Sequence, residues 1–181
     1  MSKRIRITRY NKDVDGELLW NTYNDPRYVE FFRRIPPSLT RPELLNIESI
    51  TQSQFFTVLW DEWPCGFVVV SQIENFGLSC QSGVVLFEDF QDKPVDGMKI
   101  AFWALYKLCE LLFEKTTMRR VSFRFLESRK DIENSFIKAG FKKEGSYEAS
   151  SFCHGEYQNE LEYMCNKEIF KKNKEFVLCL S

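Results

Sequence analysis

The chain has 181 residues, of which 44% are hydrophobic and 28% are charged, values typical of one globular domain and inconsistent with a disordered chain. The 25 Lys and Arg side chains nearly balance the 26 Asp and Glu side chains, so the overall charge gives no attraction for nucleic acid or an acidic membrane. The six cysteines form no CxxC pair and there is one histidine, so we expect no metal site.

No stretch approaches the roughly eighteen uncharged apolar residues of a membrane-spanning helix. The basic start MSKRIRITRY also lacks the continuous apolar segment of an export signal. We therefore expect a cytoplasmic protein with reduced cysteines.

Alternating apolar and charged residues predict a half-buried strand over residues 4–10. Residues 16–24 predict a helix that stops before a proline, because proline disfavours the helical conformation in the residue preceding it. A second helical run covers residues 28–34. Thr40 then has the character of an N-cap and predicts the start of a third helix.

The middle of the chain changes to strand patterns. Residues 55–60 and 65–73 flank a polar turn and predict a hairpin, and residues 78–89 predict a further strand. Residues 97–115 predict the longest helix, because their leucines and alanines recur at three- and four-residue spacing.

The pattern then alternates again over residues 119–127, a predicted strand. A short helix over 131–139 ends at Gly140, the residue favoured after a helix. Two last strands are expected at about 144–152 and 157–165.

This order of elements predicts an α+β (α/β) fold with a mixed sheet and helices on both faces. We expect a single domain over residues 1–170 and a C-terminal tail over 171–181. The apolar end FVLCL of that tail would pair with a second subunit, giving a homodimer, or close the sheet.

Four local segments occur in the order found in one known family: WNTYNDPRYVEFF (20–32), residues 83–112, FIKAGFKKEGSY (136–147) and FCHGEYQNELEYMCNKEIF (152–170). Together they resemble the first helix, the cofactor strand, loop and helix, a helix end, and the closing hairpin of the GNAT superfamily of acyl-CoA-dependent N-acetyltransferases. The resemblance is greatest to the branch of ribosomal-protein alanine N-acetyltransferases (RimJ/RimL-like) and covers about residues 3 to 170.

The resemblance implies a GNAT fold: a mixed, mostly antiparallel sheet of six to seven strands whose two central parallel strands splay apart. It implies acetyl-CoA as cosubstrate, no metal, and direct attack of a primary amine on the acetyl group. The acceptor would be a protein N-terminus or a small amine.

The loop before the long helix departs from the family pattern. A pyrophosphate is held by backbone N–H groups at a helix N-terminus, and glycines let the chain come close to it. Aligned on Gln91, the family pattern places Pro94 and Asp96 where small residues are usual. Pro94 has no N–H to donate and Asp96 brings a carboxylate beside the phosphates.

A second alignment treats residues 94–96 as an insertion. The amides at the helix start would then hold the pyrophosphate, those of Gly97, Met98 and Lys99, with Asp96 as the N-cap. Lys93 and Lys99 would offset the charge of Asp96. Both alignments stay open, and the atypical loop motivates an alternative function: a catalytically degenerate GNAT-fold domain that binds a protein partner.

The family position of the fourth strand implies that its last backbone N–H groups polarise the thioester, those of Val85, Leu86 and Phe87. Glu88 is the candidate general base, acting through water, and Asp89 is the second candidate. Tyr147 is a distant candidate for protonating the leaving thiolate, which could also leave without an acid. Arg129 is a candidate ligand of a CoA phosphate.

Aromatic side chains concentrate in the first helices and the closing hairpin. They would form the acceptor wall, and the candidates are Trp20, Tyr28, Phe31, Phe32 and Tyr157.

Overall fold

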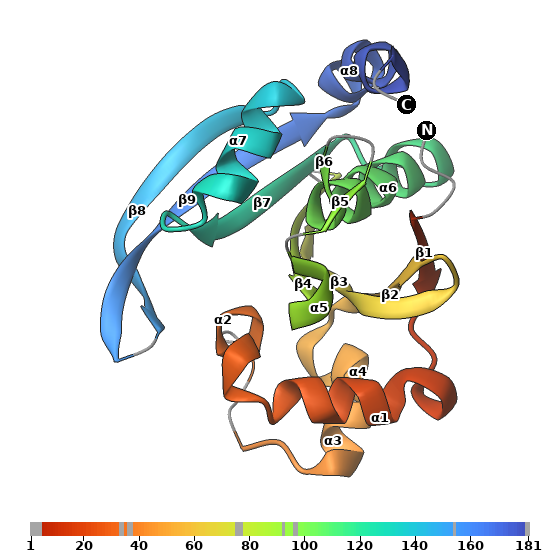
Figure 1. Ribbon diagram of the computed structural model, residues 1–181, viewed down its shortest axis with the longest axis vertical. Helices are drawn as coiled ribbons and strands as arrows, with labels where there is room; N and C mark the ends of the chain where they lie inside the picture. Colours follow the sequence, from red (N-terminus) through yellow and green to blue (C-terminus); the bar gives the residue numbers. More distant parts are fainter. Residues whose placement is uncertain are drawn as a thin grey trace.

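The structure is a computed structural model that describes residues 5–32, 35, 38–74, 78–91, 93–95, 98–153 and 155–179. Its centre is a seven-stranded sheet in the order β1-β2-β3-β4-β7-β9-β8 (Figure 1). All neighbouring strands are antiparallel except β4 and β7, which are parallel. The strands are β1 (Ile5–Arg9), β2 (Gln54–Trp60), β3 (Trp63–Glu74), β4 (Ser79–Leu86), β7 (Arg120–Leu126), β8 (Lys142–Cys153) and β9 (Glu156–Asn166). This is the mixed, mostly antiparallel sheet predicted from the sequence.

Short helices from the first third of the chain cover one face of the sheet, below it in Figure 1. They are α1 (Lys12–Tyr23), the 3-10 turn η1 (Pro26–Tyr28), α2 (Val29–Phe32), α3 (Arg41–Leu45) and α4 (Ile47–Thr51). The sequence sets their starts. Asn11 Oδ1 accepts a hydrogen bond from Asp13 N at 3.0 Å, and Glu43 Oε2 accepts one from Thr40 N at 2.8 Å.

These helices enclose the smaller of two cores. Leu19 of α1, Leu44 of α3 and Ile47 of α4 are fully buried against the sheet residues Phe55 and Phe67. The apolar side chains at helical spacing in the first third of the chain therefore serve mainly as core.

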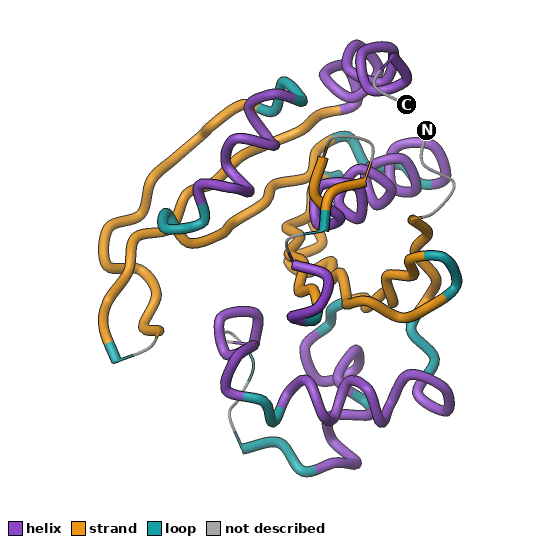
Figure 2. Tube along the Cα trace, viewed as in Figure 1, coloured by secondary structure: helices purple, strands orange, loops and turns teal. Residues whose placement is uncertain are grey.

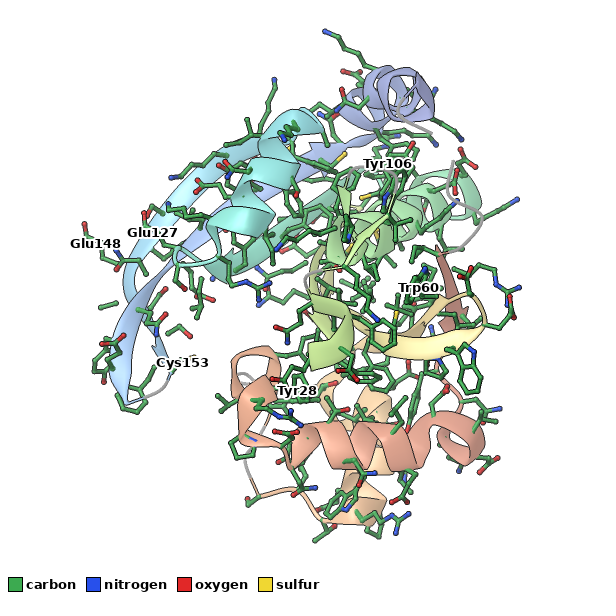
Figure 3. The ribbon with its side chains drawn as sticks, in the orientation of Figure 1. Tyr28, Trp60, Tyr106, Glu127, Glu148 and Cys153 are labelled. Atoms are coloured by element: carbon green, nitrogen blue, oxygen red, sulfur yellow. The ribbon has the colours of Figure 1, made fainter. Side chains whose placement is uncertain are left out.

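The opposite face carries α6 (Ile100–Lys115), α7 (Lys130–Lys138) and α8 (Lys167–Cys179), so helices lie on both sides of the sheet (Figure 2). Tyr106 of α6, labelled in Figure 3, packs on Phe170 of α8 with ring centroids 5.0 Å apart. Gly140 ends α7 at φ +76°, a conformation that residues with a Cβ rarely adopt.

The chain between β4 and α6 differs from the prediction. β4 ends at Leu86, and the short helix α5 (Glu88–Gln91) follows, so Glu88 and Asp89 begin a helical turn instead of ending a strand. Two paired segments, β5 (Pro94–Val95) and β6 (Met98–Lys99), come next. The long helix begins at Ile100, three residues later than predicted, because this hairpin occupies the residues before it.

The C-terminal segment also differs from the prediction. Residues Lys167–Cys179 form α8, so the described part of this segment does not close the sheet as a strand, and the predicted boundary at residue 170 falls inside the helix. Among the described helices, none combines the length and apolarity needed to cross a bilayer.

Candidate active site

The two parallel strands β4 and β7 separate halfway along their length. Their pairing joins Ser79–Ser82 to Arg120–Phe123 and stops there. β4 continues to Leu86 paired only with β3, and β7 continues to Leu126 paired only with β9. The facing backbone edges of residues 83–86 and 124–126 are therefore not bonded to each other, and the sheet opens between them.

The backbone of β4 directs one of the three predicted N–H groups into this opening. Phe87 N donates to Cys65 O of β3 at 2.9 Å, and Val85 O lies so close to Gly66 of β3 that a Cβ there would meet it at 2.1 Å. Backbone groups of successive residues point to opposite sides of a strand, so the Leu86 N–H faces β7. Leu86 O points to the same side of the strand as its own N–H and accepts a hydrogen bond from Gln91 Nε2 at 3.1 Å.

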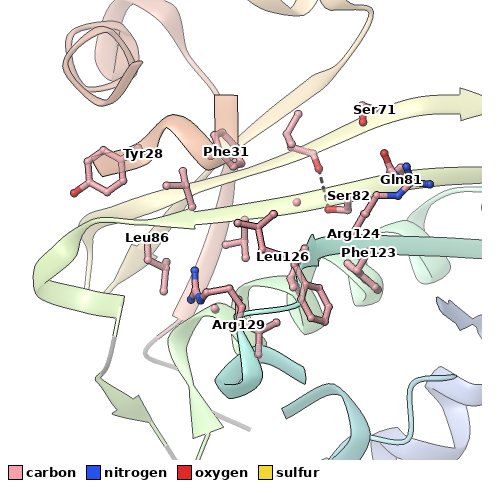
Figure 4. A pocket seen from close by; sticks show the side chains of 18 of the residues that line it. Tyr28, Phe31, Ser71, Gln81, Ser82, Leu86, Phe123, Arg124, Leu126 and Arg129 are labelled. Atoms are coloured by element: carbon pink, nitrogen blue, oxygen red, sulfur yellow. Dashed lines mark hydrogen bonds between the residues drawn. The ribbon is translucent and has the colours of Figure 1, made fainter. Parts of the chain in front are cut away.

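A pocket of about 320 Å³ occupies the opening and reaches both faces of the sheet (Figure 4). From the side of the first helices it is lined by Tyr28 and Phe31. From the side of α6 and α7 it is lined by Ala101, Leu105, Arg129 and Ile132. A long, thin substrate entering from one face would thus meet a second substrate entering from the other.

Of the five predicted acceptor-wall aromatics, the pocket brings two together. Tyr28 is 7% exposed, and its hydroxyl accepts a hydrogen bond from Glu88 N at 3.0 Å; Phe31 lies beside Gly83. The other three lie elsewhere: Phe32 is core, Trp20 stacks on its neighbour Tyr23, and Tyr157 is 72% exposed at the tip of the β8–β9 hairpin.

The candidate bases lie on α5, in the chain between Leu86 and Gln91, which line the pocket, but they are not lining residues themselves. The Glu88 carboxylate forms an ion pair with Arg27, which also binds Asp25 at 2.6 Å. The hydrogen bond from Arg27 lowers the pKa of Asp25. Asp89 is the next residue of α5 and no buried residue belongs to this short helix. Glu88 is therefore fixed relative to the first helices while its side chain stays open to water.

Tyr147 belongs to a three-residue cluster on β7, β8 and β9. Its hydroxyl donates to Glu162 Oε2 at 2.5 Å, Arg124 Nη2 donates to the same oxygen at 2.8 Å, and the guanidinium of Arg124 lies 4.0 Å from the Tyr147 ring centroid. Burial would raise the pKa of Glu162, but hydrogen bonds from Tyr147, Arg124 and Ser122 outweigh it and hold that pKa below its usual value. The hydrogen bond to Glu162 raises the pKa of Tyr147.

Arg124 is the member of this cluster that lines the pocket, and sequence reasoning missed it. It is one polar residue in the alternating stretch 119–127, where the outward side chains of a strand ordinarily meet solvent. Its role as a wall residue depends on the separation of β4 from β7, which the local pattern does not encode.

The residues predicted to bind the cofactor in the loop before α6 differ in their contacts with the rest of the protein. Gln91 binds Leu86 O, and Lys93 Nζ lies 5.0 Å from the Trp60 ring and 4.7 Å from the Phe90 ring, so both contact protein groups. Met98 and Lys99 form β6, and Lys99 is the N-cap of α6; Gly97, like Asp96, lies outside the described residues.

No group of three His, Cys, Asp or Glu side chains suited to a metal occurs among the described residues. The cysteines Cys65 and Cys80 are buried, and burial raises the pKa of each thiol to about 12. They are therefore poor nucleophiles at neutral pH.

A mixed seven-stranded sheet whose parallel central strands splay around a two-sided pocket is the GNAT fold. Known structures bear this out. The crystal structure of spermidine N-acetyltransferase from Vibrio cholerae in complex with CoA and spermine superposes with a TM-score of 0.79 at 14% identity, over 94% of this chain and 99% of that chain. A probable acetyltransferase gives a TM-score of 0.73 at 18% identity, over 92% and 95% of the two chains.

The dodecameric structure of the Vibrio cholerae spermidine N-acetyltransferase in an intermediate state gives a TM-score of 0.77 at 14% identity, over 92% of this chain and 96% of that chain. No protein-family model matches the sequence, and a search of curated proteins found no match. At these identities the structural likeness establishes the fold.

Proposed function

We propose that the protein transfers an acetyl group from acetyl-CoA to a primary amine. The observation that carries the proposal is the opening between β4 and β7, which joins the two faces of the sheet through one pocket. Two substrates that enter from opposite faces meet at the open backbone edge of β4, where a direct transfer needs no covalent enzyme intermediate. The solved structure with CoA and spermine has the same fold and supports this assignment.

The residues around the opening fit acetyl-CoA. The Leu86 N–H faces the opening and is suited to polarise a thioester carbonyl, and Arg129 lines the pocket on the side of α7. Among the described residues, no side chain caps the N-terminus of α6, so its first amides are suited to a pyrophosphate. Acetyl-CoA supplies an activated acyl group when bound; the chain supplies position and hydrogen bonds.

Proton transfer is assigned to groups on α5 and β8, which lie outside the residues that line the pocket. Glu88 takes the proton of the attacking amine through water, with Asp89 as the second candidate, because both lie on α5 directly after β4. Tyr147 is proposed as the donor to the leaving thiolate. Its phenol is already directed at Glu162, so this role requires a change of hydrogen-bond partner.

The acceptor is proposed to be a small amine or a protein N-terminus, held against Tyr28 and Phe31. The sequence resemblance to ribosomal-protein alanine N-acetyltransferases favours a peptide, whereas the spermidine N-acetyltransferases favour a small amine. The cytoplasmic location and the pairing of two copies remain predictions from the sequence.

Calorimetric titration with acetyl-CoA, followed by release of free thiol with a panel of amines and N-terminal peptides, tests the proposal. Gly83→Val is designed to fill the acceptor side, because a Cβ at Gly83 points between Val69 and Phe31 at 3.7 and 3.9 Å. We expect it to reduce amine turnover while acetyl-CoA still binds. Ser146→Val on the exposed strand β8 is the matched control.

A second candidate function is a GNAT-fold domain that binds a protein partner without catalysis. It is favoured by the β5–β6 hairpin, which stands where a glycine-rich loop is usual and begins with Pro94, a residue without an N–H. The same titration separates the two functions: absence of acetyl-CoA binding at about millimolar ligand, a free energy weaker than about −4 kcal/mol, would leave only the binding module.

A further inference from the structure

Arg124 occupies a special position in the opened sheet. Phe123 is the last residue of β7 that pairs with β4, so Arg124 is the first residue of β7 beyond the point where β4 and β7 separate. Phe123 and Phe125 pack on Phe136 of α7, with ring centroids 5.0 and 5.6 Å apart. Because successive side chains of a strand point to opposite faces, Arg124 projects to the other face, where Phe31 lines the same pocket (Figure 4).

The guanidinium of Arg124 is only partly satisfied by the protein. Nη2 binds Glu162 at 2.8 Å, and the Tyr147 ring supports the guanidinium plane at 4.0 Å. Nε is buried and has no hydrogen-bond partner among the described residues. The side chain is 22% exposed, so part of the group is accessible from the pocket.

We propose that Arg124 is a specificity-determining residue that binds an oxygen of the acceptor close to its reacting amine; this rests on the proposed acetyl transfer. The oxygen belongs to a carboxylate or to an amide carbonyl, the two groups that a planar guanidinium recognises best. Glu162 and Tyr147 hold the guanidinium plane in place, which prepares it for that contact.

A polyamine is not a suitable ligand for the guanidinium of Arg124. Its protonated nitrogens donate hydrogen bonds, as Arg124 does, and they carry the same charge. Glu162 offers little compensation to such a ligand, because its side chain is only 11% exposed and already accepts bonds from Tyr147 and Arg124. The acceptor class therefore differs from the spermidine named for the structures with the same fold.

Three amines with one skeleton test the proposal: 2-phenylethylamine, L-phenylalaninamide and L-phenylalanine. They differ only in the group beside the amine, which is hydrogen, carboxamide or carboxylate. With kcat/KM expressed per free amine, we expect at least one oxygen-bearing amine to exceed 2-phenylethylamine by about tenfold or more, since a site built to bind an oxygen rejects the analogue that lacks it. The better of the two identifies the source of the oxygen.

The variant Arg124→Gln should abolish that preference, and Arg124→Lys should restore only part of it, because an ammonium lacks the planar fork. Arg120→Gln is the control, since Arg120 lies on the same face of β7, pairs with Glu144 and does not line the pocket. The readout is the ratio between acceptors, which a general loss of stability or of proton transfer would leave unchanged.

Calorimetry gives a test that does not need turnover. N-acetyl-L-phenylalaninamide should bind wild-type protein more tightly than N-(2-phenylethyl)acetamide, and Arg124→Gln should remove the difference. Equal kcat/KM values for the three amines, faster reaction of spermidine, or no measurable binding of either product overturns the inference. If acetyl-CoA binds and amines react without an oxygen preference, acetyl transfer stands and only the inference about Arg124 fails. If acetyl-CoA does not bind, acetyl transfer fails, and the product titrations still show whether Arg124 binds an oxygen of the ligand.

Discussion

The indole Nε1 of Trp103 donates a hydrogen bond to the carbonyl oxygen of Val95 at 2.6 Å. Val95 belongs to β5 and Trp103 to the first turns of α6, so one buried bond joins the hairpin to the helix that follows it. Both residues are almost fully buried. The position of the chain in front of the α6 N-terminus therefore depends on this contact.

Trp103→Phe should lower the free energy of unfolding by about 1–3 kcal/mol, because it removes the donor of the buried hydrogen bond to Val95 O. Acetyl-CoA binding should weaken further than stability alone explains, since the hairpin loses its attachment to α6. Urea unfolding and calorimetry measure the two effects. Trp63→Phe, at a position 74% exposed, is the control and should change neither. An unchanged acetyl-CoA affinity in Trp103→Phe would show that the hairpin does not contribute to the cofactor site.

Gly66→Ala should destabilise the protein by about 1–3 kcal/mol. The added Cβ would meet Val85 O at 2.1 Å, a backbone atom that moves only if β4 moves. Gly83→Ala is the matched control on β4, because its Cβ meets nothing closer than 3.7 Å. Urea unfolding of both variants checks the difference, and equal stabilities would contradict the close approach of β3 and β4.

Glu88→Gln should lower kcat by about 10²–10⁴-fold, because the amide cannot accept the proton of the amine. Stopped assays of thiol release measure kcat. Asp89→Asn should leave most activity. The reverse result, with Asp89→Asn inactive and Glu88→Gln active, would transfer the role of base to Asp89.

Glu162→Gln should cost stability in a pH-dependent way. Hydrogen bonds outweigh burial and make the pKa of Glu162 lower in the folded protein than its unfolded value of about 4.3. The ionised form therefore favours folding: its contribution is complete above the unfolded pKa and is lost as the pH falls through the folded pKa. Urea unfolding at a series of pH values should show the wild-type advantage over Glu162→Gln shrinking in acid, whereas a constant difference would contradict the assigned shift.

The regular elements could be predicted because local chemistry fixes them. Thr40 with Glu43 begins α3, and Gly140 ends α7, each at the position expected from its side chain. The segment after β4 could not be predicted in the same way. A two-residue pairing such as β5 with β6 leaves no periodic pattern, and its position depends on the distant donor Trp103.

Only part of the candidate site could be predicted from the sequence. Tyr28, Phe31, Leu86 and Arg129 line the pocket, and their roles stay predictions. Arg124 was missed, because a charged residue in an alternating strand ordinarily faces solvent, and only the separation of a neighbouring strand makes it a wall of the site.

The final helix has a practical meaning for anyone who shortens this protein. Phe170 covers Tyr106 and Phe113, Lys174 binds Glu114 at 2.5 Å, and Asn173 lies where a side chain on residue 140 would stand. A chain cut after residue 170 would lose the contacts made by Lys174 and Asn173. Phe170 would then lie at a frayed chain end, and aromatic surface of α6 would become exposed. Such a product should aggregate during expression, so affinity tags and truncations are better placed at the N-terminus than within Lys167–Cys179.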